Sequence, residues 1–191
     1  MKFHISVLIL IFSLLHMPVS AANYTPPPTA QEQLSHAIDY FQSGKYHEAL
    51  LLFGKLSKDY RLNPRFQAYM GVCCFYEKDY KQTAAIFDSI MPRLESFAPR
   101  ERSIYYHCAA ESAYQLKQYG KAIQLFEHQS LLCYDNEKGD ALLHIGLCYR
   151  CIGDIATAQE YLQEAVAYYR RFNAPDKLTQ VEKEMMYIEG K

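Results

Sequence analysis

The sequence predicts an all-α fold in which one pair of helices is repeated along the chain. From Ala30 onward, small and apolar residues recur at the spacing of one helix face. The same pattern of small and aromatic residues returns after 34 residues, and a fixed period of about 20 to 50 residues is typical of solenoids. The chain has 191 residues, of which 50% are hydrophobic and 21% charged, so we expect one globular domain.

The first 21 residues have the features of a signal peptide. Lys2 provides a positive start, Ile5 to Leu15 form an apolar run, and small residues before Ala22 supply a cleavage pattern. The run is shorter than the roughly 20 residues that a membrane span needs, and an uncleaved anchor or a buried helix is the alternative. We therefore expect an exported protein, periplasmic or secreted, with no stable membrane insertion after cleavage.

Residues 22–29 are expected to form a Pro-rich spacer. Three consecutive prolines, Pro26 to Pro28, cannot lie inside a helix and favour an extended conformation. A proline-rich ligand for another domain is the alternative.

Four copies of the helix pair follow the spacer. The matching positions are Ala37, Tyr40, Gly44, Tyr46, Ala49 and Phe53 in the first copy; Gly71, Cys74, Lys78, Tyr80, Thr83 and Phe87 in the second; Ala110, Tyr114, Tyr119, Ala122 and Phe126 in the third; and Gly146, Tyr149, Gly153, Ile155, Ala158, Leu162 and Ala165 in the fourth. The first small residue of each copy lets the second helix approach closely, while the large residues fill the space beside that contact.

Two further positions of the pattern have a physical role. Gly44 and Gly153 fall where a helix must end and the chain must reverse, which glycine permits because it adopts positive φ. In the second helix, alanine supplies the small contact in three copies, whereas Thr83 replaces it in the second copy. We expect this replacement to loosen the second hairpin slightly.

Together these residues resemble the tetratricopeptide repeat family over residues 30–169, although the chain has no Trp and Cys74 takes the place of an aromatic residue. The resemblance implies a right-handed solenoid of about four helix-turn-helix units within a domain spanning 30–172. The units are expected at residues 30–63, 64–97, 103–136 and 139–172, with extra residues around Ser96 to Arg102. Stability should then be roughly a sum of local and nearest-neighbour contributions.

Residues 173–191 are expected to form a capping helix. Pro175 and Asp176 are typical of a helix start, and an apolar stripe follows at helical spacing. The stripe consists of Leu178, Val181, Met185 and Ile188. Such a helix would cover the apolar face that the last repeat otherwise exposes, although an amphipathic helix that binds a partner is the alternative.

Charge and motifs limit the possible functions. A net charge of -1 and the lack of a basic cluster argue against nucleic-acid binding. The sequence contains no nucleophile elbow, no phosphate-binding loop and no zinc-protease motif. We therefore expect a protein that is not an enzyme and needs no cofactor.

The family resemblance implies that a partner binds in the concave groove lined by the first helices. The residues expected there are Leu34, Ile38 and Phe41 from the first unit, Arg65, Tyr69, Phe75 and Tyr76 from the second, His107, Glu111, Tyr114 and Gln115 from the third, and His144, Leu147 and Arg150 from the fourth. This surface is aromatic, with Arg65 and Arg150 available for a carboxylate. The alternative is that many of these aromatic side chains only pack between adjacent helices.

Family members that hold the C-terminal carboxylates of chaperones use Lys, Asn and Arg at inward positions. Here those positions are occupied by Leu34, Ile38, Tyr69, Ile104 and Cys108. The carboxylate clamp is therefore absent, and we do not expect binding of chaperone tails.

Six cysteines allow a different kind of site. In an exported protein an even number favours disulfides, although four of the six fall in first helices, where cysteine packs as a small apolar residue. Cys148 and Cys151 have redox-motif spacing, and His144 lies on the same helix face as both. A metal or thiol site at these three residues, completed by His107 or Cys108, is therefore an alternative.

The favoured function is a scaffold or adaptor, in the cell envelope or outside the cell, that binds a protein or peptide segment in its groove. A structural subunit of an envelope assembly or secretion complex is the second hypothesis. It would use the convex face or the extra residues around Ser96 to Arg102.

Overall fold

The computed structural model describes residues 27–188 and residue 190, and these residues form α-helices joined by short turns, with no strand. The expected signal peptide and residues 22–26 of the expected spacer lie outside the described residues. The helices are α2 (Ala30–Gln42), α3 (Tyr46–Asp59), α4 (Pro64–Tyr76), α5 (Tyr80–Ile90), the 3-10 helix η2 (Met91–Leu94), α6 (Pro99–Gln115), α7 (Tyr119–Leu132), α8 (Asp135–Ile152), α9 (Ile155–Arg171) and α10 (Pro175–Ile188). Within this part of the chain, no helix combines the length and the apolar character that a membrane crossing requires.

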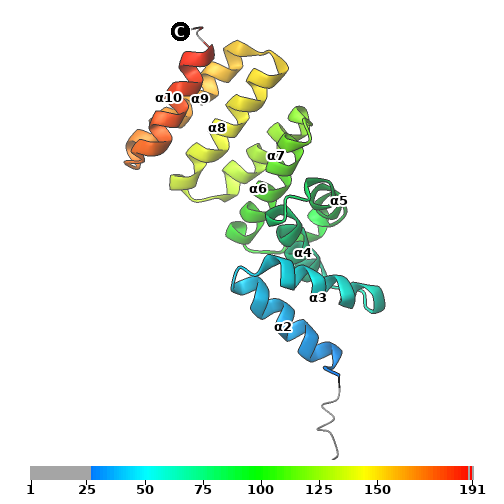
Figure 1. The fold of residues 1–191 in the computed structure, drawn as a ribbon. Helices are drawn as coiled ribbons and strands as arrows, with labels where there is room; N and C mark the ends of the chain where they lie inside the picture. Colours follow the sequence, from blue (N-terminus) through cyan, green and yellow to red (C-terminus); the bar gives the residue numbers. More distant parts are fainter. Residues whose placement is uncertain (1–26, 189, 191) are drawn as a thin grey trace, which may run out of the picture.

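Consecutive helices pair into four hairpins that stack along one direction. The hairpins are α2 with α3, α4 with α5, α6 with α7, and α8 with α9, and α10 packs on α9 at the far end. Figure 1 shows an elongated stack that runs from α2 at one end to α10 at the other. The predicted all-α solenoid of four helix-turn-helix units with a C-terminal capping helix is therefore confirmed.

Short polar side chains define where several helices begin. At the start of α2, Thr29 and Glu32 form a capping box, in which the Thr29 hydroxyl accepts a hydrogen bond from the Glu32 backbone N–H at 3.3 Å. Asn63 caps α4, whose first residue is Pro64. Asp79 and Asp154 cap α5 and α9 in the same way. These caps satisfy backbone donors that would otherwise lack a partner.

All four hairpin turns have a residue with left-handed backbone conformation at the same position. Gly44 and Gly153 have φ of 73° and 88°, as expected, and Lys78 and Lys117 occupy the equivalent positions with φ of 62° and 60°. The backbone N–H after this residue donates to a carbonyl in the last turn of the first helix, for example from Asp79 to Cys74 at 2.9 Å. The turn is thus fixed by hydrogen bonds, and glycine is not required at every copy.

Close helix contacts occur at the small residues that the repeats share. A Cβ atom on Gly71 would lie 2.9 Å from the Phe87 ring, and one on Gly146 would lie 2.9 Å from the Leu162 side chain. Thr83 is fully buried and its hydroxyl donates to the Asp79 carbonyl at 2.9 Å. The hydroxyl is therefore satisfied, and the hairpin accepts threonine in place of alanine without an unpaired polar group.

The third and fourth units begin earlier than the sequence pattern indicated. Helix α6 starts at Pro99 and α8 at Asp135, whereas the units were expected to begin at residues 103 and 139. These two helices have 17 and 18 residues, against 13 in α2 and α4. Part of the expected insertion around Ser96 to Arg102 is therefore an additional helical turn at the start of α6.

Gly146 provides a test of the close helix approach. We expect Gly146→Ala to destabilise the protein by about 1 to 3 kcal/mol, because its methyl group would overlap Leu162 and approach the Ala158 carbonyl oxygen at 3.2 Å. Urea unfolding followed by circular dichroism measures this change. As a control, Gly54→Ala in α3 meets no atom within 4 Å and should stabilise the protein by up to about 1 kcal/mol. Equal midpoints for wild type and Gly146→Ala would contradict the requirement for glycine.

Candidate functional site

A pocket of about 340 Å³ lies where α4, α6 and α8 meet, and we call it the central pocket. Its lining consists of Tyr76 from α4, Arg100, Ser103, Ile104 and His107 from α6, Gln129 from α7, and Glu137 and Asp140 from α8. Tyr76 and Ile104 are 54% and 42% exposed, although both are large and apolar. The pocket therefore combines an accessible apolar surface with several polar side chains.

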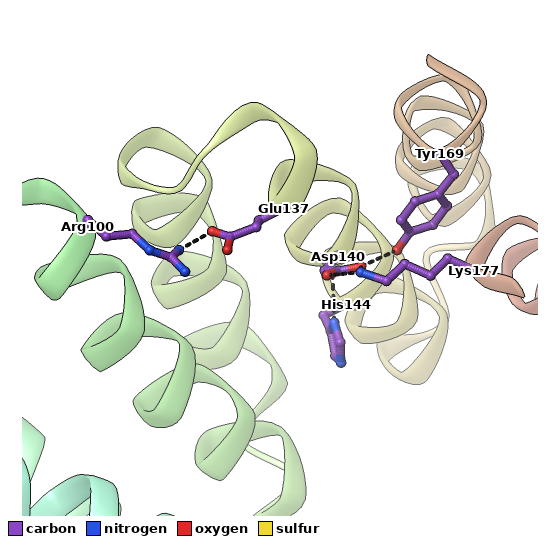
Figure 2. Close-up of polar contacts among 6 residues, drawn as sticks. All are labelled: Arg100, Glu137, Asp140, His144, Tyr169 and Lys177. Atoms are coloured by element: carbon purple, nitrogen blue, oxygen red, sulfur yellow. Dashed lines mark hydrogen bonds and ion pairs between the residues drawn. The ribbon is translucent and has the colours of Figure 1, made fainter. Parts of the chain in front are cut away.

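Ion pairs connect the first helices of successive units. Arg65 of α4 contacts Glu101 of α6 at 3.2 Å, and Arg100 of α6 pairs with Glu137 of α8. Two more pairs connect α8 to α10: Lys177 with Asp140, at 2.7 Å from Nζ to Oδ1, and Arg150 with Glu184. Figure 2 shows the pairs at Glu137 and Asp140. We call these four pairs the ion-pair series.

The ion-pair series changes the role of two residues expected in the groove. The guanidinium groups of Arg65 and Arg150 each face a carboxylate of the chain itself, and each also lies over an aromatic ring, that of Phe97 or Tyr187. Neither arginine is therefore free in this structure to take a partner's carboxylate.

Asp140 is the most connected side chain of the site. Its carboxylate accepts hydrogen bonds from the Tyr169 hydroxyl at 2.9 Å and from the Lys177 ammonium (Figure 2). Burial, and then the nearby Asp140 carboxylate, raise the pKa of Tyr169, so the phenol stays protonated and keeps donating. Asp140 thus ties α9 and α10 to α8 and fixes one wall of the central pocket.

Most aromatic residues expected in the groove pack between units. Tyr69 stacks on Phe41 with ring centroids 4.2 Å apart, and Phe75 meets His107 edge-on at 6.0 Å. Tyr114 is half-buried against Tyr119 within its own unit. Tyr76 differs, because it stacks on Tyr46 at 4.0 Å and still leaves more than half of its surface exposed. Of this aromatic set, Tyr76 is therefore the side chain best placed to meet a partner.

A partly buried cluster of polar side chains lies at the central pocket and consists of His107, Glu111, Gln129 and His144. The Nδ1 atom of His144 lies 2.7 Å from the Asp140 backbone carbonyl, and its Nε2 atom lies 3.4 Å from Glu111 Oε2. Within the described residues, Glu111 Oε2 and Gln129 Oε1 are buried and accept no hydrogen bond. Gln115 is exposed and donates to the other Glu111 oxygen at 2.8 Å.

Burial controls the protonation of His107. Desolvation, and then the nearby His144, lower the pKa of His107 below its usual value of 6.5, and these effects outweigh the attraction of Glu111 and Asp140. His107 is therefore mostly neutral at pH 7.

Several residues of the central pocket were not among those expected from sequence. Arg100, Ser103, Gln129, Glu137 and Asp140 belong to it, and so does Ile104, which stands at a position of the carboxylate clamp. The sequence does contain a signal for the charged residues of the pocket. Opposite charges recur 36 or 37 residues apart, about one repeat, as in Arg65 with Glu101 and Arg100 with Glu137. Gln129 lies in α7, the second helix of its unit, and a prediction restricted to the first helices does not include it.

The cysteines do not form a chemical site. All six are free, and Cys148 is fully buried, whereas Cys151 is exposed at the end of α8. Burial raises the pKa of Cys148 to about 12, the opposite of what a reactive thiolate requires. In the part of the chain that the structure describes, no three His, Cys, Asp or Glu side chains are grouped to hold a metal ion. The geometry therefore gives no support to a site at His144, Cys148 and Cys151.

The stacked hairpins, with a pocket on the face made by their first helices, define the chain as a helical-repeat solenoid. Within that class its fourth unit is similar to the tetratricopeptide repeat. Residues 140–171, which make up most of the fourth unit, match the family model described as tetratricopeptide repeat.

Solved structures have the same fold at low sequence identity. MamA from Desulfovibrio magneticus RS-1 is similar with a TM-score of 0.59 and 16% identity, over 84% of this chain and 94% of that one. The apo form of RapI gives a TM-score of 0.68 and 12% identity, over 84% of this chain and 63% of that one. A Rap protein complexed with Competence and Sporulation Factor gives 0.55 and 15%, over 83% and 47% of the two chains. No curated protein matches the sequence.

The lowered pKa of His107 leads to a prediction about pH. An unfolded chain binds a proton at His107 below about pH 6.5, whereas the folded protein resists this, so stability should fall as the pH drops below that value. In an NMR titration, the ring signals of His107 should have a midpoint below 6.5. For His107→Asn, the stability measured by urea unfolding should decrease less between pH 7 and 5 than the stability of the wild type does. A midpoint at or above 6.5 would contradict the assignment.

Proposed function

We propose that the protein is a non-enzymatic scaffold that binds a protein or peptide segment along the face formed by α4, α6 and α8. The observation that carries this proposal is the central pocket, where Tyr76 and Ile104 expose apolar surface beside polar groups. Exposed apolar side chains on a concave, largely pre-formed surface favour binding of a partner segment. The nearly neutral charge of the whole chain fits a protein partner better than a nucleic acid.

The contacts between the first helices support the proposal. The ion-pair series and the inter-unit aromatic contacts hold the first helices in place before a partner arrives. A pre-organised surface loses less conformational entropy when it binds. The Rap protein with a similar fold, which is complexed with Competence and Sporulation Factor, is consistent with ligand binding by such a solenoid.

We also propose that the protein is exported, in keeping with the positive and apolar N-terminal residues of the sequence. The scaffold would then act in the periplasm or outside the cell.

The binding face can be tested by cross-linking. A photoreactive residue at Ile104 should form an adduct with the partner in native cell-envelope or secreted fractions, whereas one at Gln124, on the exposed face of α7, should not. The double variant Tyr76→Ala with Ile104→Ala should weaken capture of the same partner about 10-fold or more, because it removes two exposed apolar contacts. Leu131→Ala on α7 is a matched control, since Leu131 is also exposed. Adducts formed equally from both positions would count against the groove.

Export has its own test. N-terminal sequencing of the protein that accumulates in the native cell should give Ala22 as the first residue. A mature chain that retains residues 1–21 would rule out cleavage at this position.

A further inference from the structure

We propose that the central pocket holds a basic side chain, arginine or lysine, of the bound segment. This inference rests on the proposed function, because it names the chemistry of the segment that the groove receives.

Two hydrogen-bond donors of the pocket, on Arg100 and Ser103, are already engaged. The Arg100 guanidinium pairs with Glu137 and lies 4.9 Å from the centre of the Tyr134 ring. The Ser103 hydroxyl donates to the Arg100 backbone carbonyl at 2.9 Å. A carboxylate could take either of these two donors only by breaking contacts that stabilise the wall of the pocket.

Acceptors, in contrast, remain without a donor. Gln129 Oε1 belongs to a side chain that is only 7% exposed and lines the pocket, and within the described residues it accepts no hydrogen bond of normal geometry, although the His107 ring lies next to it. Glu111 Oε2, in the cluster beside His107, has no donor either. A buried acceptor without a partner is unfavourable, so an occupant that brings N–H groups gains affinity here.

The protonation of His107 does not oppose this preference. Burial, and then the nearby His144, lower the pKa of His107, so at pH 7 its ring is mostly uncharged and does not repel a cation.

The charge of the lining also favours a cation. With His107 neutral, the charged lining residues are one arginine, Arg100, and two carboxylates, Glu137 and Asp140. Lys177, which pairs with Asp140, does not line the pocket and is 45% exposed. The lining is therefore acidic by one charge.

The shape of a basic side chain suits the two parts of the pocket. The methylene stem of arginine or lysine would lie against Tyr76 and Ile104, while its charged head would approach the lining residues Gln129, Glu137 and Asp140. The five N–H groups of a guanidinium could satisfy several acceptors at once, and its plane can stack on a tyrosine ring. An aliphatic side chain would fill the apolar part and leave the acceptors without donors.

NMR of the ¹⁵N-labelled protein with small probes tests this preference. The probes are the N-acetyl amides of arginine, citrulline, leucine and glutamate, of which citrulline keeps the shape of arginine but lacks its charge. The arginine probe should shift the side-chain amide signals of Gln129 and the backbone signal of Ile104 saturably. It should bind at least about 5-fold more tightly than the citrulline probe, since charge-assisted hydrogen bonds are the stronger ones.

Variants identify the acceptor. Gln129→Met removes the acceptor at similar volume and should weaken the arginine probe about 5-fold or more, as read from the Ile104 signal. Gln124→Met, on the exposed face of the same helix, should leave binding unchanged. If Gln129→Met does not give a folded spectrum, Glu111→Gln replaces it and should weaken binding by removing the second acceptor's charge.

The possible outcomes separate this inference from the proposed function. If the leucine or glutamate probe binds as tightly as the arginine probe, the proposed preference for a basic side chain is overturned. The cross-links at Ile104 would still decide whether a partner binds in the groove. Absence of shifts with every probe up to solubility would overturn the inference as well. Shifts that persist unchanged in Gln129→Met would show that arginine binds elsewhere and would also overturn it.

Discussion

The close approach of paired helices at small residues is the constraint on which the rest of the structure depends. Ala37, Gly71, Ala110 and Gly146 are all buried and occupy the same position in their units. Each lets the second helix pack against the first at short distance, so each hairpin presents nearly the same face to the next. The central pocket then exists because three such hairpins stack with their first helices side by side.

The repeat could be predicted from sequence because its physical requirement is local. A small residue facing a large one at a fixed period is visible without knowledge of the fold, and Gly146 with Leu162 is a clear example. The turns were predicted where glycine occurs, at Gly44 and Gly153. They were not predicted at Lys78 and Lys117, because hydrogen bonding between the turn and the preceding helix imposes the left-handed conformation on a residue that disfavours it.

The site was harder to predict, because it depends on contacts between units. Sequence spacing placed Arg65 and Arg150 on the inner face, but it could not show that Glu101 of α6 and Glu184 of the capping helix α10 reach them. Tyr76 was expected in the groove together with Tyr69, and the structure separates the two, since Tyr69 is largely covered by its neighbours. The exposure of the tyrosines and the pairing of the arginines depend on how the units stack. The pattern of residues along one helix gives no information about this stacking.

The left-handed lysines distribute strain unevenly along the solenoid. A residue other than glycine in this conformation costs of the order of 1 kcal/mol or more. The outer hairpins avoid this cost with Gly44 and Gly153, whereas the two inner hairpins bear it at Lys78 and Lys117. The central pocket draws most of its lining from those inner hairpins. The proposed binding face is therefore built on the two units whose turns are intrinsically least favourable, so contacts with the neighbouring units have to compensate for this cost.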